Sequence, residues 1–205
     1  MDLDEFNFAA LGGTGVHAIR LGYLSIAMGR PNLTVVDQVS GVARGMFLRE
    51  EDYDFLSGLD PSVPSQSFTP EQEGLLLTLE RDSAFAFYRT GDPLETLDLI
   101  PVKRADIAVV GETEDGFLMR VGPQLPFEVT ALGSRLFEYL VTGTKLGDVV
   151  IAARDEMLSD PEEREILAEI EQEESRPLQD ILTDELFILI RQLVQAGAIT
   201  IEPNK

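Results

Sequence analysis

Cysteine and histidine are nearly missing from this chain of 205 residues, which has no cysteine and a single histidine, His17. Without cysteine, disulfides, thiolate metal sites and a cysteine nucleophile are excluded. With one histidine, histidine-rich metal clusters are excluded and a catalytic triad that depends on histidine is disfavoured. His17 itself is expected to be a packed or hydrogen-bonded side chain, not a ligand or a base.

Basic residues are also few, because 16 lysines and arginines face 37 acids and give a formal net charge of −21. Binding to nucleic-acid phosphates requires clustered lysines and arginines, so no nucleic-acid partner is expected. No uncharged run is long enough to span a membrane, since Arg20 and Arg30 interrupt the most apolar stretch. The start "MDLDEFNF" is acidic where a secretory signal is basic, which predicts a cytoplasmic protein.

The charge is unevenly distributed along the chain. Residues 1–49 hold four acids and four bases, so the whole surplus of negative charge lies in residues 50–205. The neutral segment also holds seven of the 17 glycines. Such a segment is expected to be buried in the core or to contact another molecule, and burial is the commoner fate of apolar sequence.

The neutral segment contains a glycine pattern, Gly13-x-Gly15-x-x-Ala18, within "FNFAALGGTGVHAIRLGYLSIAMGRPNLTVVDQ". In a dinucleotide fold such glycines let pyrophosphate approach a helix N-terminus, and an acid such as Asp37 takes the ribose hydroxyls. The stretch resembles the start of ThiF-like adenylating enzymes. No further βα units follow, however, and no lysine precedes Lys103. Gly13, Gly15 and Asp37 are therefore weak cofactor candidates, and no cofactor is predicted.

The middle of the chain allows more than one interpretation. Apolar residues at helical spacing favour a helix over residues 33–50, with a strand at "LTVV" as the alternative. Residues 58–70 are rich in proline and serine and predict a loop or linker. Residues 74–92 predict two strands with a turn near Asp82.

The C-terminal half has a clearer pattern of three strands followed by helices. The strands are expected within "VKRADIAVVGE", "GFLMRVG" and "FEVT", and two helices follow in residues 131–157. Asp160 and Pro161 predict the start of a third helix, in which eight acids and one base lie between residues 160 and 174. This helix is expected to be solvated, with an acidic partner-binding face as the alternative. The last helix is expected to begin with Thr183 as N-cap and to precede a closing strand, "AITIE".

The fold class that follows is α+β, with a mixed α/β region over residues 1–100; over 101–205, a resemblance to a known family implies a winged-helix-like domain. The segments "GFLMRVGPQLPFEVTALGSRLFEYLVTGTKLGDVVIAARDE" and "TDELFILIRQLVQAGAITI" resemble the PqqD-like family of peptide recognition domains. The resemblance spans residues 102–202. The acidic helix 160–174 departs from the family pattern as an insertion.

The resemblance implies that a precursor peptide adds as a strand beside the third strand and lies against the last helix. Carried over by position, the peptide-binding candidates on the strand are Phe127, Glu128, Val129 and Thr130. The candidates on the last helix are Leu186, Phe187, Ile190 and Arg191.

These features favour a non-catalytic accessory protein that presents a precursor peptide to a maturation enzyme. One alternative is a structural or assembly protein of a larger particle that oligomerises through residues 1–49, and another is a nucleotide-binding enzyme of ThiF-like type. No nucleophile with a neighbouring base is visible, so no catalytic residue and no metal ligand is predicted. DNA binding is not expected, because the last helix offers a single base, Arg191.

Overall fold

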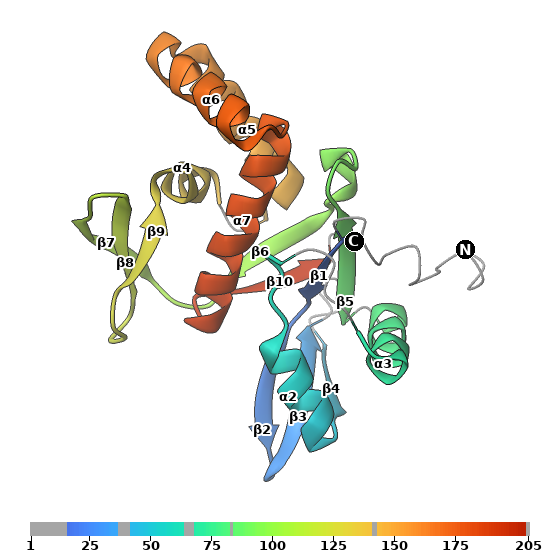
Figure 1. Cartoon of the computed structure of the whole chain (residues 1–205). Helices are drawn as coiled ribbons and strands as arrows, with labels where there is room; N and C mark the ends of the chain where they lie inside the picture. The colour runs from blue at the N-terminus through green and yellow to red at the C-terminus, as the bar shows by residue number, and fades with distance from the viewer. Residues whose placement is uncertain (1–15, 37–41, 64–67, 83, 141–142, 204–205) are drawn as a thin grey trace. The chain divides into compact units, whose positions relative to one another are not determined.

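The computed structural model describes residues 16–36, 42–63, 68–82, 84–140 and 143–203 (Figure 1). The chain divides into two compact units, Met1–Thr90 with Lys205 and Gly91–Asn204. The domain boundary expected after residue 100 falls within strand β6 (Leu99–Lys103) of the second unit. Helices and small antiparallel sheets occur in both units, which confirms the α+β class.

The described residues of the first unit form two antiparallel sheets. Strand β1 pairs with β5 in one sheet, and the other has the order β2-β3-β4. The bounds are β1 (Val16–Arg20), β2 (Tyr23–Ala27), β3 (Arg30–Val36), β4 (Ala43–Phe47) and β5 (Phe85–Arg89). Gly22 lies between β1 and β2 with φ +82°, and a Cβ there would meet the Thr34 main-chain oxygen at 2.1 Å. The passage from one sheet to the other therefore requires glycine at this position.

The helix predicted over residues 33–50 is wrong, because its described residues form strands β3 and β4. Leu33 and Val35 are buried while Thr34 between them is half-buried, which is the alternation of a strand. The alternative prediction of a strand at "LTVV" is confirmed. Helix α2 (Glu50–Gly58) begins only where the predicted helix was expected to end.

The first of the two strands predicted in residues 74–92 is also wrong, because helix α3 (Pro70–Arg81) occupies it. Thr69 and Gln72 form a reciprocal capping box, and Pro70 stands in the first turn. These signals lie outside the segment from which the strand was predicted. The second predicted strand is confirmed by β5, whose Phe85 and Tyr88 are buried.

The core of the first unit gathers side chains from both sheets and both helices, among them Leu33, Leu56, Leu76 and Phe85. His17 is fully buried in this unit. Its Nδ1 lies 2.7 Å from the Pro61 main-chain oxygen and its Nε2 lies 3.1 Å from the Thr90 hydroxyl. The expectation of a packed, hydrogen-bonded histidine is therefore confirmed.

The second unit also contains two antiparallel sheets. Strand β6 pairs with the closing strand β10 (Ile199–Pro203), and the other sheet has the order β7-β8-β9. The bounds of the latter are β7 (Ile107–Glu112), β8 (Gly116–Val121) and β9 (Phe127–Thr130). The three predicted strands and the closing strand are thus present. A short helix, η2 (Leu94–Thr96), precedes β6.

Four helices follow the β7-β8-β9 sheet (Figure 1). They are α4 (Ala131–Tyr139), α5 (Leu146–Ser159), α6 (Pro161–Glu174) and α7 (Leu178–Gln195). Helix α6 begins as predicted, because the Asp160 carboxylate accepts hydrogen bonds from the Glu162 and Glu163 main-chain N–H groups at 2.8 and 3.4 Å. Most of its acidic side chains are exposed, which agrees with the expected solvated helix.

The predicted start of α7 at Thr183 is wrong. Thr183 is buried inside the helix, where its hydroxyl donates to the Gln179 main-chain oxygen at 2.7 Å. Contacts with the preceding segment hold the true start: Arg176 donates to Asp184 at 2.6 Å, and Leu178 N–H donates to the Glu171 carboxylate at 3.1 Å. The hydrogen bond from Arg176 to Asp184 also raises the pKa of Arg176 above its usual value.

Helix α7 is the centre of the core of the second unit. Half of its residues are buried, and it packs against α4, α5, α6 and β10. This breadth of apolar surface explains why its sequence lacks a one-sided stripe. Gly147 at the start of α5 lets the helix backbone approach η2, since a Cβ there would meet the Leu94 main-chain oxygen at 2.0 Å.

Candidate functional site

The four strand residues predicted to bind peptide form β9, an edge strand of the β7-β8-β9 sheet. Val129 is buried and Phe127 is half-buried, so their side chains serve the core. Glu128 and Thr130 are exposed. The Thr130 hydroxyl is engaged by α4 and α7, so Glu128 is the exposed side chain of β9 that is accessible to a partner.

The apolar residues predicted on the last helix are core residues. Leu186, Phe187 and Ile190 are fully buried or nearly so, and they hold α7 against the rest of the second unit. Arg191 is half-buried on the same helix. The predicted apolar face of α7 thus stabilises the fold and offers no exposed surface to a peptide.

The main-chain groups of β9 divide between the neighbouring strand and the open edge. Val129 is the register partner of Phe117 on β8, and the Ala131 N–H donates to the Asp115 main-chain oxygen at 3.2 Å. Because hydrogen-bonded and non-bonded pairs alternate in an antiparallel ladder, the main-chain groups of Val129 face β8. Those of Glu128 face away from the sheet.

This open edge is short. Pro126 has no N–H to offer, and the Thr130 side chain caps α4 by accepting a hydrogen bond from the Gly133 N–H at 2.9 Å. The outward groups of β9 are consequently the N–H and carbonyl of Glu128 and the N–H of Thr130.

Helix α7 contacts this edge through two side chains. The Gln192 amide donates to the Glu128 main-chain oxygen at 2.8 Å, and the Thr130 hydroxyl donates to the Glu185 carboxylate at 2.6 Å. Gln192 and Glu185 lie two helical turns apart on the same face, with half-buried Ile188 between them. The Gln192 side-chain oxygen is buried and has no hydrogen-bond partner among the described residues. Gln192 therefore supplies the donor that a further strand would supply, and it retains an unused acceptor.

A second feature of this unit is an apolar pocket of about 310 Å³ between α4 and α6. Helix α5 contributes Met157 and strand β8 contributes Phe117. The remaining apolar lining consists of Ala131, Leu132, Ile166, Leu167 and Ile170.

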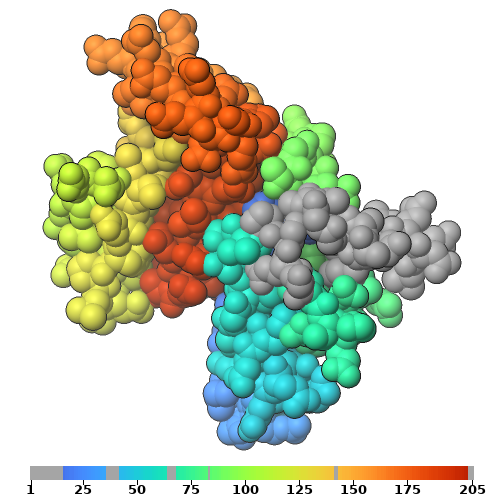
Figure 2. Space-filling view, viewed as in Figure 1, coloured from blue at the N-terminus to red at the C-terminus, as the bar shows by residue number. Residues whose placement is uncertain are grey.

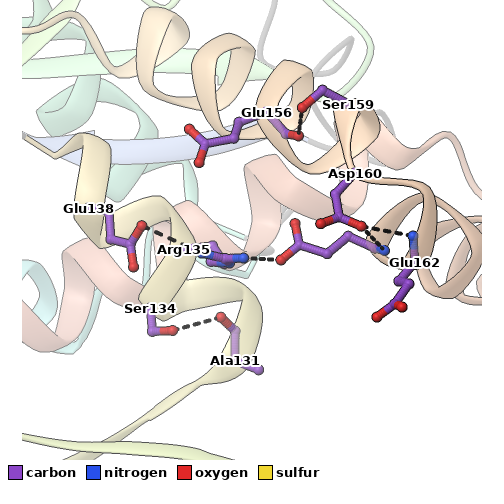
Figure 3. A network of polar contacts seen from close by, with 9 residues as sticks. Ala131, Ser134, Arg135, Glu138, Glu156, Ser159, Asp160 and Glu162 are labelled. Carbon is purple, nitrogen blue, oxygen red and sulfur yellow. Dashed lines mark hydrogen bonds and ion pairs between the residues drawn. The ribbon is translucent and has the colours of Figure 1, made fainter.

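The polar lining of the pocket is built around Arg135 of α4 (Figure 3). Arg135 forms an ion pair with Glu163 in the first turn of α6 and a longer one, at 3.6 Å, with Glu138 on its own helix. The two carboxylates together exceed the charge of the arginine. The pocket thus has an apolar interior with a net negative charge at its border.

Only part of this pocket is visible as a pattern in the sequence. The narrow apolar stripe of Ile166, Leu167 and Ile170 is visible at helical spacing. The opposing wall is formed by α4, which contributes Leu132 and Arg135. Only the tertiary structure shows that Leu132 and Arg135 line the same pocket as the stripe.

The glycine pattern lacks the local structure that a nucleotide site requires. Gly13, Gly15 and Asp37 lie outside the described residues. The residues that follow the glycines form strand β1, where a dinucleotide fingerprint needs the start of a helix. Within the described part of the chain, no group of three or more acidic or histidine side chains is arranged to hold a metal ion.

A scan against protein-family models, a search of curated proteins and a search of solved structures each found no match for this chain. In the residues that the structure describes, no helix has the length and apolarity needed to cross a membrane. The function is therefore inferred from the geometry of the second unit and from the surface of the first.

Proposed function

We propose that this protein is a non-catalytic accessory protein that binds a precursor peptide and presents it to a maturation enzyme. Its second unit acts as a winged-helix, PqqD-like recognition element, and the peptide adds as a strand along the open edge of β9. The observation that carries this proposal is the hydrogen bond from Gln192 to the Glu128 main-chain oxygen at 2.8 Å. The Gln192 side-chain amide donates to the main-chain oxygen to which the N–H of an added strand would donate.

Strand addition obtains affinity from main-chain hydrogen bonds and selectivity from alternate side chains. At β9 the outward main chain is that of Glu128, and the exposed neighbouring side chains are Glu128 and Thr130. An arriving peptide N–H replaces the Gln192 amide at the Glu128 oxygen. The Gln192 side chain must give up this contact before the peptide can pair with β9, so Gln192 competes with the peptide.

The proposal is tested by removing the outward N–H of β9 without disturbing its ladder with β8. Glu128→Pro does this, because proline is tolerated on an edge strand where its N–H would face away from the sheet. Val129→Pro is unsuitable, since the Val129 N–H faces β8. The matched control is Val109→Pro on β7, the other edge strand of the sheet. Val109 is 56% exposed. The main-chain groups of its neighbour Ala108 face β8, so those of Val109 face away from the sheet.

Tagged wild-type protein and both variants are used to capture peptides from extracts of the native cells, with recovery quantified by mass spectrometry. We expect a short peptide and a modifying enzyme with the wild type. Recovery of the peptide should fall about fivefold with Glu128→Pro, which corresponds to roughly 1 kcal/mol of binding free energy. Recovery should stay unchanged with Val109→Pro. Equal recovery with all three proteins contradicts strand addition at β9.

A second candidate function, a structural or assembly protein, is favoured by the surface of the β2-β3-β4 sheet. Exposed large apolar side chains gather in and beside its strands, namely Tyr23, Ile26, Met28, Val42 and Phe47. The β2-β3 hairpin, blue in Figure 2, carries Met28 at its tip with 96% of the side chain exposed. Tyr23 and Phe47 lie on the face of the sheet opposite Ile26, and exposed apolar side chains on one sheet face suit contact with another protein.

Sedimentation velocity separates the two functions. An assembly protein should self-associate at micromolar concentration, and Met28→Ser should shift the distribution toward the monomer. Leu125→Ser is the control, because Leu125 is 88% exposed but lies in the second unit. A monomer at all concentrations, unaffected by either substitution, contradicts assembly through this sheet.

A further inference from the structure

We propose that the pocket between α4 and α6 is a docking site for a partner protein, and that it takes a large apolar side chain from a segment flanked by lysines or arginines. This site is separate from the β9 edge and does not depend on peptide addition there. The inference rests on three properties of the pocket: its apolar interior, its accessible wall and the sign of the charge around it.

The interior is suited to an aliphatic or aromatic side chain. Met157 and Leu167 form buried parts of the lining, and Phe117, Leu132 and Ile170 are half-buried. At about 310 Å³ the pocket lies at the lower limit of small-molecule sites, which fits one or two anchor side chains. Burying such an anchor removes apolar surface from water on both partners.

One wall of the pocket is accessible from solvent. Ile166 of α6 lines the pocket and is 57% exposed, although it stands in a helix whose other large apolar residues, Leu167 and Ile170, are turned inward. An exposed isoleucine next to an apolar hollow leaves a continuous apolar surface from the rim to the interior. Helices that dock in grooves use surfaces of this kind.

The charge around the pocket selects a basic partner. Residues 131–174, which supply α4, α5 and α6, hold twelve acids and four bases. The base in the lining, Arg135, is already engaged by Glu163 and Glu138. The acids on α6 and the end of α5, such as Glu156, Glu162 and Glu165, are exposed. Opposite charge on a partner steers encounter and repels acidic competitors.

The test uses three fluorescein-labelled synthetic peptides of equal length and the full chain. The first probe carries leucines at helical spacing among lysines, the second has glutamates in place of the lysines, and the third has serines in place of the leucines. Binding is followed by fluorescence anisotropy. We expect the first probe to bind at least tenfold more tightly than either of the others, because it alone satisfies both the pocket and the surrounding acids.

Two substitutions assign the binding to the pocket. Ile166→Ser should weaken binding of the first probe about fivefold or more, as loss of a contact at an interface centre does. The control is Ile26→Ser in the first unit, since Ile26 is 60% exposed and the chemical change is identical. Ala131→Phe fills the pocket from an exposed position and should abolish binding without lowering the thermal midpoint.

Three results overturn the proposal. Equal affinity for the first probe and the third, which lacks leucines, shows that charge alone drives binding. Equal affinity for the first probe and the second, which carries glutamates, shows that apolar contacts drive binding without selection by charge. Equal loss with Ile166→Ser and Ile26→Ser places the binding elsewhere on the chain. None of these results bears on peptide capture at β9, so failure here and failure of the proposed function are distinguishable.

Discussion

Gln192 and Glu128 are 64 residues apart in the chain, yet the Gln192 amide donates to the Glu128 main-chain oxygen at 2.8 Å. This contact ties the C-terminal half of α7 to the open edge of β9. It satisfies one of the few outward main-chain groups of that strand. The same contact also competes with any strand that pairs there.

Gln192→Ala should therefore have two opposite effects. The free energy of unfolding should fall by about 1 kcal/mol, the net value of one hydrogen bond, while recovery of captured peptide should rise. Chemical denaturation and quantitative capture measure the two effects. Gln195→Ala is the control, because Gln195 is exposed near the end of the same helix. A fall in both stability and capture would mean that Gln192 is only a part of the binding surface.

The Glu202 carboxylate is a buried charged group of the second unit. It lies on β10 with 3% of its side chain exposed and accepts a hydrogen bond from Arg104 at 2.8 Å. Arg104 also donates to the Thr200 hydroxyl at 3.0 Å. Arg104→Ala should lower the free energy of unfolding by about 2 kcal/mol or more, because a buried carboxylate loses its cation.

Arg154→Ala is the matched control for this ion pair. Arg154 pairs with Asp155 at 2.9 Å on the surface, and such pairs contribute about 0–1 kcal/mol. Urea denaturation of the two variants measures the contrast. Similar losses for both would show that water reaches Glu202 in the folded protein.

Alanine substitutions at two helical glycines should change the free energy of unfolding in opposite directions. Gly147→Ala should cost more than about 2 kcal/mol, because its Cβ would meet the Leu94 main-chain oxygen at 2.0 Å and force α5 away from η2. Gly74→Ala in α3 should stabilise by about 0.5–1 kcal/mol, since nothing lies within 4 Å of its Cβ. Thermal unfolding followed by circular dichroism compares them. Changes of the same sign would contradict the close approach of α5 to η2.

Met28 is a strained residue at the tip of the β2-β3 hairpin. Its φ is +53° and that of Gly29 is +72°, in a two-residue turn that favours Asn-Gly. Met28→Asn should therefore raise the free energy of unfolding by about 1 kcal/mol. Met28→Leu, which keeps an apolar side chain in the same backbone conformation, should give no gain. Equal stability of the two variants would show that the turn carries no strain.

Some elements with strong local signals were predicted correctly from the sequence, but α3 was missed although Thr69 and Gln72 form a capping box at its start. Asp160 and Pro161 located the start of α6, and the apolar segments "GFLMRVG" and "FEVT" located β8 and β9. The start of α7 was missed because its determinants, the Arg176–Asp184 and Glu171–Leu178 contacts, depend on how α6 ends. No local pattern encodes them.

The errors in the first unit have a different physical origin. Residues 33–50 place apolar side chains at positions that suit both a helix and alternating strands, and pairing of β3 with β2 and β4 decides between them. For the candidate sites, the sequence predicted β9 as the peptide-binding strand and gave an acidic partner-binding face on α6 as an alternative, but it did not predict the pocket beside that helix. It could not show that Gln192 reaches Glu128 or that α4 closes the pocket, because both depend on tertiary packing.

If a peptide pairs with β9 as proposed, the shortness of this open edge limits how long the peptide stays bound. The outward main-chain groups of Glu128 and Thr130 permit about three hydrogen bonds, and at roughly 1 kcal/mol each these amount to about two powers of ten in an equilibrium constant. Retention would then depend on side chains of the peptide and on a second protein that shares it. An edge of this size suits a carrier that hands its cargo to the next protein and is quickly free to load again.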